Sequence, residues 1–445
     1  MREQRDARVG VGDRSLSLPL PLSLPLPLPL VTRELHSTTR EVPGGAMSRA
    51  ARRHVLVITA ALVIATATPA AAQVLTPSDF SYLGAFRVEC PGDACSYNLT
   101  DLGSAPDGYL WVTDHVYDYA VRRIEVPMAP VASQSWEDLP VAATLEGPLS
   151  TGGCPAANTD ISGVEAIGAE PASTCRDWYN VTGDYTPVFY RRIGATIEEI
   201  GPRTPPFHPN KFGAYLFTLP AAWVTGQGLG AKTLVTGFSR EAGANGGSQG
   251  PTLFAFDPDN PADAVDLLYY REIYPGCPYQ GDCDFPGYQS PDSWMGADWV
   301  ATSAGRAVLV AGVKAGSTCY GSGAACGDPC RDSQGYHGYP YTGRVLIYDP
   351  SDLEARLTGS LEPWQVVPVA QWDPAELWEQ ECPDVGGLAF DEASGRLFLA
   401  ERLVGSSGEG VVHVYQVRGG AAVFADGFET GGTQAWSVML PESSS

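Results

Sequence analysis

Short hydrophobic runs separated by Gly, Pro and Asp turns recur along most of this 445-residue chain. The runs are rich in β-branched and aromatic residues, and almost no stretch has apolar residues at the i, i+3 and i+4 positions of an amphipathic helix. The 50 glycines, the 37 prolines and a charged fraction of only 18% also argue against a helical protein. The pattern predicts an all-β fold, with a sandwich, a barrel and a propeller as candidates.

A unit of four strands repeats roughly every 55 to 80 residues, which favours the propeller. The second strands of the unit are predicted at residues 109–114, 232–237, 306–311 and 396–401. The third strands are predicted at residues 121–126, 188–193, 252–257, 344–349 and 411–416. Gly-rich inner strands are predicted at residues 162–168, 295–301 and 385–390, and outer strands at 141–145, 195–200, 266–272 and 364–372.

Five such units are present, so we predict a five-bladed β-propeller, with Gly at the inner strands because the axis is crowded. The last unit lacks an outer strand, and residues 80–88 form an extra strand before the first unit. We therefore predict that this N-terminal strand pairs into the last blade and closes the ring. A β-sandwich remains an alternative fold because the second unit, around residues 177–192, matches the repeat poorly. Propellers with six or seven blades are further alternatives.

Residues 47–72 have the pattern of a signal peptide. An arginine-rich segment precedes an apolar run at residues 55–65, and an A-x-A cleavage motif ends before Gln73. The apolar run is shorter than the ~20 residues that a transmembrane helix needs, and no later segment qualifies. We therefore predict an exported protein, secreted or periplasmic and monomeric, with no transmembrane helix.

The remaining predicted parts are an extension at residues 1–46, a propeller domain at 73–418 and a C-terminal tail at 419–445. The extension contains a Ser/Leu/Pro alternation that cannot form the interior of a helix or sheet, and it indicates a mis-called start. Nine of the 28 basic and five of the 51 acidic residues lie before Gln73, so the predicted mature part carries 19 basic and 46 acidic residues. Such a charge disfavours nucleic acid and anionic membranes as partners.

All ten cysteines lie in the predicted mature part: Cys90, Cys95, Cys154, Cys175, Cys277, Cys283, Cys319, Cys326, Cys330 and Cys382. An even number of cysteines in an oxidising compartment predicts up to five disulfides. Cys90–Cys95 and Cys277–Cys283 are plausible short bridges, although the sequence does not determine the connectivity. A zinc site at Cys326 and Cys330 is the alternative, and export disfavours it because zinc-binding thiols would oxidise there.

The long connecting segments are expected on one face of the propeller, where the loops from second to third strands and from blade to blade lie. We call this the loop-rich face, and it is predicted to contain residues 90–99, 147–160, 239–250, 275–293, 312–342 and 373–384. Long loops are often functional, and disulfides can preorganise them for binding. Protection against extracellular proteases is an equally good explanation for any single bridge.

Acidic residues near the predicted inner strands are candidates for catalysis. Asp101, Glu165 and Asp298 are the main ones, with Asp160 and Asp384 close by. Glycosidases use paired carboxylates, and the arrangement resembles five-bladed propellers that cleave glycosides, in architecture only. No local motif matches a glycosidase family, and acids at the junction of a turn and a strand are commonly turn formers.

A second group of candidates combines His, Tyr, Asp and Arg side chains. Its members are His115, a candidate catalytic residue, and the candidate ligand-binding residues Asp114, Tyr185, Arg240, His337, Tyr339 and Tyr341, with Tyr190 and Arg191 nearby. Such a set is typical of a polysaccharide lyase, and equally of a Tyr-rich surface that binds carbohydrate or peptide, which we favour. His208 and His413 are predicted to be structural.

Cofactors are not predicted. Calcium at Asp257, Asp259 and Asn260, or at Asp332, is an alternative, but no EF-hand spacing supports it and a β-turn is the default. No metal site is predicted. The chain has no G-x-S-x-G, H-E-x-x-H, P-loop or Rossmann motif, which disfavours the common hydrolases, zincins, kinases and dehydrogenases.

Several sequence strings resemble a group of uncharacterised secreted bacterial β-propeller-like proteins. They are DFSYLGAFRV at residues 79–88, LPAAW at 219–223, FAFDP at 254–258, YHGYPY at 336–341 and GGLAFDEASGRLFLAE at 386–401. The resemblance spans most of residues 76–417 and implies a fold, not an activity. Residues 424–437 resemble a short DGFExG…WS tail found at the C-termini of assorted exported bacterial proteins.

The sequence therefore predicts an exported β-propeller that binds an extracellular ligand, a glycan or a protein, through its loop-rich face. The alternative is a polysaccharide-degrading enzyme, a glycoside hydrolase or a lyase, with its site in the axial funnel. Carboxylates that face each other across the axis would favour a hydrolase, and a His, Tyr and Arg cluster would favour a lyase.

Overall fold

The computed structural model describes part of the chain, all of it within the compact unit Ala67–Ser445. The described residues are 73–89, 98–115, 118–133, 135–150, 154, 159–177, 188–193, 196–200, 213–237, 248–271, 280–281, 284–404 and 408–420. The predicted extension, the predicted signal peptide and residues 421–445 lie outside these ranges, and so does His208. The structural statements below concern the described residues.

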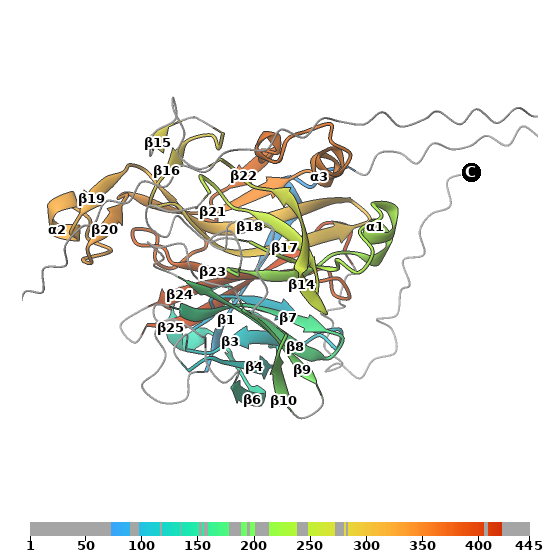
Figure 1. Cartoon of the computed structure of the whole chain (residues 1–445). Coiled ribbons are helices and arrows are strands. Elements are labelled where there is room, and N and C mark those ends of the chain that lie inside the picture. Colours follow the sequence, from blue (N-terminus) through green and yellow to red (C-terminus); the bar gives the residue numbers. More distant parts are fainter. Residues whose placement is uncertain are drawn as a thin grey trace, which may run out of the picture. The chain divides into compact units, whose positions relative to one another are not determined.

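Five sheets form a five-bladed β-propeller, as predicted, and all of their strand pairs are antiparallel except that of β1 with β5 (Figure 1). Blade 1 consists of β2 (Leu102–Ser104), β3 (Leu110–Thr113), β4 (Ala120–Ile124) and β6 (Thr144–Ser150). Blade 2 consists of β7 (Thr159–Ile167), β8 (Glu170–Asp177), β9 (Val188–Ile193) and β10 (Thr196–Glu199). Blade 3 consists of β11 (Leu216–Thr218), β12 (Leu234–Thr236), β13 (Leu253–Asp257) and β14 (Asn260–Leu268).

The last two blades contain the longest strands. Blade 4 consists of β17 (Ser293–Thr302), β18 (Gly305–Ala315), β21 (Tyr341–Tyr348) and β22 (Ala370–Trp372). Blade 5 consists of β23 (Val385–Asp391), β24 (Arg396–Val404), β25 (Glu409–Val417), β1 (Phe80–Val88) and β5 (Val141–Ala142). Two small hairpins, β15 (Gln280–Gly281) with β16 (Tyr288–Gln289) and β19 (Cys319–Gly321) with β20 (Gly335–His337), lie in connections.

Helices are short and occur only in connections. They are α1 (Ala221–Gly226), α2 (Gly323–Cys326) and α3 (Pro350–Leu357), with the 3₁₀ turns η1 (Pro77–Asp79), η2 (Trp136–Asp138) and η4 (Pro363–Gln365). In α3, Pro350 occupies the first turn and the Asp349 side chain accepts a hydrogen bond from the Ser351 N–H, so both ordinary start signals are present. No described helix is long and apolar enough to cross a membrane.

The N-terminal strand closes the ring as predicted. β1 pairs antiparallel with β25 from Phe80 opposite Val417 to Val88 opposite Gly410. Beside this ladder, the Asp79 carboxylate forms an ion pair with Arg418, and Phe80 stacks on Trp372 of blade 4 at 4.8 Å between ring centroids. The two ends of the propeller are therefore held in one sheet, so the free edge of β25 is covered.

Glycines allow the inner strands to approach each other around the axis. Contacts run from β2 to β7, β11, β17, β23 and back to β2, which completes a circle. A Cβ atom added at Gly387 would lie 2.3 Å from the Leu102 nitrogen, and one at Gly296 would lie 2.5 Å from the Leu388 nitrogen. Any larger residue would push neighbouring blades apart, which confirms the reason for the predicted Gly-rich inner strands.

Most predicted strands are confirmed, and the exceptions have physical reasons. β2 and β11 have only three residues each, too few for a hydrophobic pattern. β8 reads EPASTCRD and has no apolar run, although its Ala172 and Cys175 are buried. The predicted outer strand at residues 141–145 is divided, because Val141–Ala142 pairs with β1 while Thr144 begins β6.

Removal of the closing strand should abolish cooperative unfolding of the propeller. A chain that lacks residues 73–88 loses the β1–β25 ladder and exposes the edge of β25. We expect no sharp transition in its thermal melt monitored by circular dichroism. A chain that begins at Gln73 is the control, and a melt unchanged by the longer deletion would contradict the closure.

Substitution of an inner-strand glycine should be strongly destabilising. Gly387→Ala places a methyl group against the backbone of β2, and we expect a loss of about 1–3 kcal/mol or more in the free energy of unfolding. Gly335→Ala is the matched control because an added Cβ meets nothing within 4 Å there. Urea denaturation measures both, and equal stabilities would contradict the packing argument.

Candidate functional site

The structure brings Asp101, Glu165 and Asp298 together on the inner strands. Asp101 directly precedes β2, Glu165 belongs to β7 and Asp298 belongs to β17. Asp101 is fully buried, and Glu165 and Asp298 are each 8% exposed. Their charges repel one another, Glu165 interacting with both of the other carboxylates. The three acids chosen from the sequence therefore do form one electrostatic cluster.

Two of these carboxylates accept hydrogen bonds from backbone N–H groups of neighbouring blades. Asp101 Oδ2 accepts from the N–H of Val164 in blade 2 at 3.0 Å and of Leu216 in blade 3 at 2.9 Å. Asp298 Oδ2 accepts from the N–H of Phe390 in blade 5 at 2.6 Å. Because an inner strand has no further strand to pair with, such acceptors satisfy N–H groups that would otherwise be buried without a partner.

Burial makes the three carboxyl groups hard to ionise. Burial raises the pKa of Asp298 to about 7, against hydrogen bonds from Phe390 and Trp299 that lower it. Burial, and then the charge of Asp298, raise the pKa of Glu165 well above its usual value. Burial also raises the pKa of Asp101 well above its usual range. A carboxyl group that stays protonated near neutral pH can serve as a general acid, so the predicted catalytic role stays a prediction.

Asp114 and His115 follow β3 at the loop-rich face. Asp114 is buried and lies 3.3 Å from the guanidinium of Arg122, whose side chain is 1% exposed. Burial lowers the pKa of Arg122, and the charge of Asp114 opposes that shift. Asp114 is thus the counter-ion of a buried arginine. His115 is half-buried beside it, and the proposed role of His115 in catalysis stays a prediction.

Other predicted ligand-binding residues divide into those outside and those inside the described part. Tyr185 and Arg240 lie outside it. Tyr190 and Arg191 lie on β9, where burial raises the pKa of Tyr190 to about 12 and Arg191 forms an ion pair with Asp259 at 2.8 Å. The structure does not bring these two residues to the axial carboxylates.

A rigid insertion joins β18 to β21 on the loop-rich face. This segment, residues 316–340, we call the blade-4 insertion; it contains β19, α2 and β20 and projects from one side of the propeller (Figure 1). The disulfide Cys319–Cys326 closes its tip, and Cys330–Cys382 ties it to the connection between blades 4 and 5. The predicted disulfide-stapled loops are confirmed here.

The remaining cysteines are partly described. Cys154–Cys175 is a third disulfide, with 5.9 Å between the Cα atoms, and it fixes the connection that leads into blade 2. Cys326 and Cys330 are bound to different partners, so they do not form the alternative zinc site. Cys90, Cys95, Cys277 and Cys283 lie outside the described residues, and their predicted bridges stay predictions.

Asp328 is the centre of the blade-4 insertion. Its Oδ2 atom lies 2.7 Å from His337 Nδ1 and accepts a 2.7 Å hydrogen bond from the Tyr341 hydroxyl, while Oδ1 accepts from the Cys330 N–H. Burial opposes ionisation, but the hydrogen bonds from Tyr341 and His337 outweigh it and lower the pKa of Asp328. Asp328 was not predicted as a site residue from the sequence, although its position between Cys326 and Cys330 was a signal.

His337 and Tyr341, both predicted to bind a ligand, are part of this buried network. His337 is 2% exposed, and its Nε2 atom lies 2.8 Å from the Ser333 carbonyl oxygen. Both ring nitrogens therefore lie within hydrogen-bonding distance of an oxygen atom, which fixes the ring in place. Tyr339 differs, because its hydroxyl donates to Glu381 at 3.0 Å near the surface.

Aromatic rings lie on the outside of the blade-4 insertion. The Tyr320 side chain is 65% exposed, and its ring meets that of Tyr336 edge to face at 5.1 Å. Tyr336 is half-buried, so it supports the exposed Tyr320 ring. An aromatic pair held in this way on a disulfide-bonded hairpin loses little conformational freedom when a ligand binds. The insertion therefore offers a preorganised surface.

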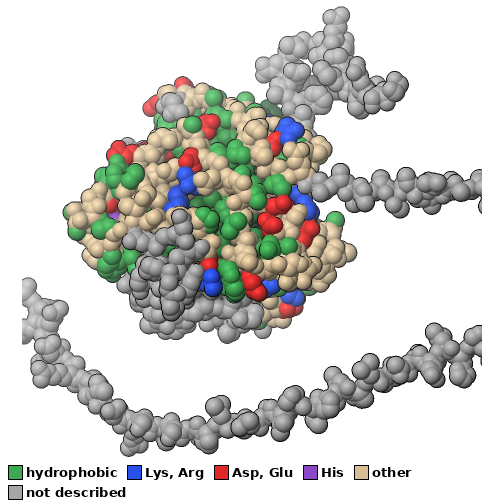
Figure 2. Space-filling model, turned by 90° about the horizontal axis from the view of Figure 1, so that it is seen from above, with side chains coloured by type: hydrophobic (Ala, Val, Ile, Leu, Met, Phe, Trp, Pro, Cys, Tyr) green, Lys and Arg blue, Asp and Glu red, His purple; other side chains and the backbone are tan. Residues whose placement is uncertain are grey.

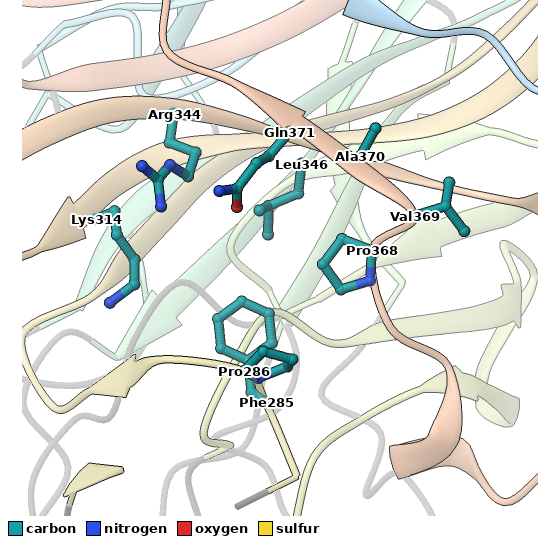
Figure 3. Close-up of a pocket in the computed structure, with 9 residues that line it drawn as sticks. All are labelled: Phe285, Pro286, Lys314, Arg344, Leu346, Pro368, Val369, Ala370 and Gln371. Atoms are coloured by element: carbon teal, nitrogen blue, oxygen red, sulfur yellow. The ribbon is translucent and has the colours of Figure 1, made fainter. Parts of the chain in front are cut away.

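A pocket opens at the base of the insertion, where β18 and β21 approach β22 (Figure 3). Its volume is about 270 Å³, and we call it the blade-4 pocket. It is lined by Phe285, Pro286, Lys314, Arg344, Leu346, Pro368, Val369, Ala370 and Gln371. None of these residues was predicted from the sequence as a site residue.

Metal binding receives no support from the described residues, where no group of three His, Cys, Asp or Glu side chains could hold an ion. The Asp257–Asn260 segment is a tight turn between β13 and β14, in which the Asp257 side chain accepts from the Asp259 N–H at 2.8 Å. Asp332 is exposed. His413, predicted to be structural, is fully buried and lies 2.9 Å from Glu401.

Comparisons with known proteins leave the function open. No family model and no curated protein matches this chain. Among solved structures, the chain is similar to Chaetomium thermophilum Raptor, with 8% identity and a TM-score of 0.28 over 77% of this chain and 30% of the Raptor chain. It is also similar to a Trichoderma reesei enzyme of carbohydrate-active family AA12, with 13% identity and a TM-score of 0.28 over 77% and 99% of the two chains. Such low TM-scores carry no argument about this chain.

The axial carboxyl group of Asp298 should make stability depend on pH. Asp298→Asn leaves one oxygen for two backbone N–H groups, so we expect a loss of about 1–3 kcal/mol in the free energy of unfolding. In the folded protein this carboxyl group keeps its proton up to about pH 7, whereas in the unfolded chain it ionises near its usual pKa of 3.8. The free energy of unfolding is therefore highest below about pH 4 and falls as the pH rises to 7, because only the unfolded chain gains from ionisation in that range.

The difference in the free energy of unfolding between the native protein and Asp298→Asn should therefore be largest near pH 4 and become smaller towards pH 8. Urea denaturation at several pH values measures it. Asp332→Asn, at an exposed site, is the control and should follow the native protein. A constant difference across this range would contradict the assignment.

Proposed function

We propose that this chain is an exported binding protein that presents the blade-4 insertion to an extracellular ligand, a glycan or a protein. The observation that carries the proposal is the exposed Tyr320, which packs against the half-buried Tyr336 on a hairpin held by two disulfides. Exposed aromatic residues are enriched at binding surfaces, and a rigid support lowers the entropy lost on binding.

The interior of the insertion supports the same proposal. The Asp328 network holds β20 and the start of β21 together below the exposed rings, and Arg331 lies over the Tyr341 ring at 4.5 Å. A loop that only had to resist proteases would need the disulfides but not an exposed aromatic ring such as that of Tyr320. The buried network and the exposed ring together support a role of this surface in binding.

Export is supported by several independent features. The predicted signal peptide at residues 47–72 precedes the propeller, and three disulfides occur in the described part of it. Disulfides of this kind persist in oxidising compartments. The resemblance to uncharacterised secreted propeller-like proteins agrees with export and names no ligand.

A polysaccharide-degrading enzyme is the second candidate. It is favoured by one observation, the cluster of Asp101, Glu165 and Asp298 with their raised pKa values. Against it, Asp101 and Asp298 are already engaged by the backbone of neighbouring blades, and Glu165 is hydrogen-bonded to Thr218. These hydrogen bonds explain why the three carboxyl groups are buried near the axis without invoking a substrate. Ligand binding is therefore the better-supported function.

Loss of the exposed rings should weaken ligand binding without unfolding the protein. We expect the double substitution Tyr320→Ala and Tyr336→Ala to reduce affinity by about tenfold or more on a glycan array or in a screen of extracellular proteins, because aromatic anchors dominate such surfaces. Met128→Ala, which removes a 93% exposed side chain elsewhere, is the control and should bind normally.

A reducing-end assay and an unsaturated-uronate assay on the same preparation test the second candidate. Turnover that disappears in Glu165→Gln or His115→Ala would establish an enzyme and overturn the binding proposal. Binding that is unaffected by the loss of both tyrosines would also contradict it.

A further inference from the structure

The blade-4 pocket lies where the hydrophobic core between blades 3 and 4 reaches the loop-rich end of blade 4. Leu346 and Phe285 form its floor, and both belong to that core. Lys314 is the second-last residue of β18 and Arg344 the fourth residue of β21, so both lie close to the ends of the blade-4 insertion. The pocket therefore lies at the base of the insertion that the proposed function assigns to the ligand.

The pocket is cationic in an acidic protein. The chain has a net charge of −23, yet the residues that line this pocket include Lys314 and Arg344 and no Asp or Glu. On the face seen in Figure 2, acidic and basic side chains are interspersed, so the charge at any one site is decided by its immediate neighbours. A pocket of this kind attracts an anion and disfavours a cation.

The ion pair of Arg344 leaves hydrogen-bonding capacity for a ligand, whereas Lys314, which also donates to the Ala315 carbonyl oxygen at 3.1 Å, contributes its charge. Arg344 uses Nε and Nη2 on Asp373, at 2.7 and 2.9 Å, and its Nη1 atom makes no hydrogen bond within the described residues. The Asp373 side chain is 45% exposed, so water competes for this pair. Lys314 donates to the buried Asp292 at 2.9 Å. Neither carboxylate lines the pocket.

The pocket also has an uncharged side that suits a ring. Pro286, Pro368 and Val369 supply apolar surface above the buried Phe285, and Gln371 places an amide beside Arg344 (Figure 3). The Gln371 amide makes no hydrogen bond within the part of the chain that the structure describes. A volume of about 270 Å³ is just below the range of about 300–1,000 Å³ typical of drug-sized ligands, so a single small ring fits better than an extended chain.

We propose that the blade-4 pocket binds a hexuronate, a sugar ring that carries a carboxylate, as one residue of an acidic glycan. The carboxylate lies on the free edge of Arg344 within the field of Lys314, the Gln371 amide bonds a ring hydroxyl, and the C–H face of the ring covers Pro286 and Pro368. This inference rests on the proposed function, since it names the class of ligand that a glycan-binding propeller would take.

Isothermal titration calorimetry on the purified full chain tests the inference with four probes: galacturonic acid, trigalacturonate, galactose and galactotriose. We expect the acidic sugars to bind at least about tenfold more tightly than their neutral counterparts, because only the acidic sugars offer a charge-assisted hydrogen bond. Comparison of monomer with trimer shows whether the free acid or the polymer is the ligand. Added salt should weaken the binding.

Two substitutions should change affinity in opposite directions. Arg344→Met keeps the apolar stem and removes the charge, and we expect about tenfold weaker binding of the acidic sugars. Asp373→Asn removes the carboxylate that competes for Arg344, and we expect tighter binding. Arg356→Met is the matched control, because Arg356 pairs with Asp266 and does not line the pocket, so it loses the same charge without affecting binding.

Failure of this inference is distinguishable from failure of the proposed function. The inference is overturned if trigalacturonate does not bind, if galactotriose binds as tightly, or if Arg344→Met binds as the native protein does while its melting temperature is unchanged. Loss of ligand binding on substitution of Tyr320 and Tyr336 supports the proposed function in each of these cases. Uronate binding that needs Arg344 but neither tyrosine would support the pocket and contradict the role of the insertion.

Discussion

The inner strand of each blade has one edge that faces the axis and pairs with no further strand, and the N–H groups on that edge need acceptors. Asp101 and Asp298 supply them across blade boundaries, from blade 1 to blades 2 and 3 and from blade 4 to blade 5. These bonds are short and buried, in surroundings where each bond is strong and an unpaired group is costly. The arrangement of the blades around the axis depends on them.

Hydrogen bonds from one blade to the next require very close packing of the inner strands, and these strands are rich in glycine for that reason. Gly387 and Gly296 leave room for the backbone of the adjacent strand, and a larger residue would prevent the carboxylates from reaching it. The outer parts of the blades then pack through five separate hydrophobic interfaces, of which the one between blades 3 and 4 is the largest. The closing strand β1 completes the last of the five sheets.

A scaffold held at its centre in this way leaves its long connections available for function. The blade-4 insertion is fixed by two disulfides and by Asp328, and the cationic pocket lies at its base, between β18, β21 and β22. An aromatic surface beside a cationic pocket matches the chemistry of an acidic glycan, which has apolar C–H faces and carboxylates. The two features therefore support one common ligand class.

The sequence by itself determined the strand repeat, the five blades, the closing strand and the Gly-rich inner strands, because period-2 patterns and turn residues are local properties. It also selected Asp101, Glu165 and Asp298, since acids next to inner strands must lie near the axis. It did not reveal the short β2 and β11, whose position is decided by packing and not by their three-residue patterns.

Only the tertiary structure decided what the site residues contact. His337 and Tyr341 read as ligand-binding residues in a Tyr-rich loop, and the fold turns them inward onto Asp328. Lys314, one of only three lysines in the chain, and Arg344 lie thirty residues apart and meet because β18 pairs with β21. Disulfide partners and pocket walls are pairings between distant segments, and a local pattern contains no information about which distant segment will be its neighbour.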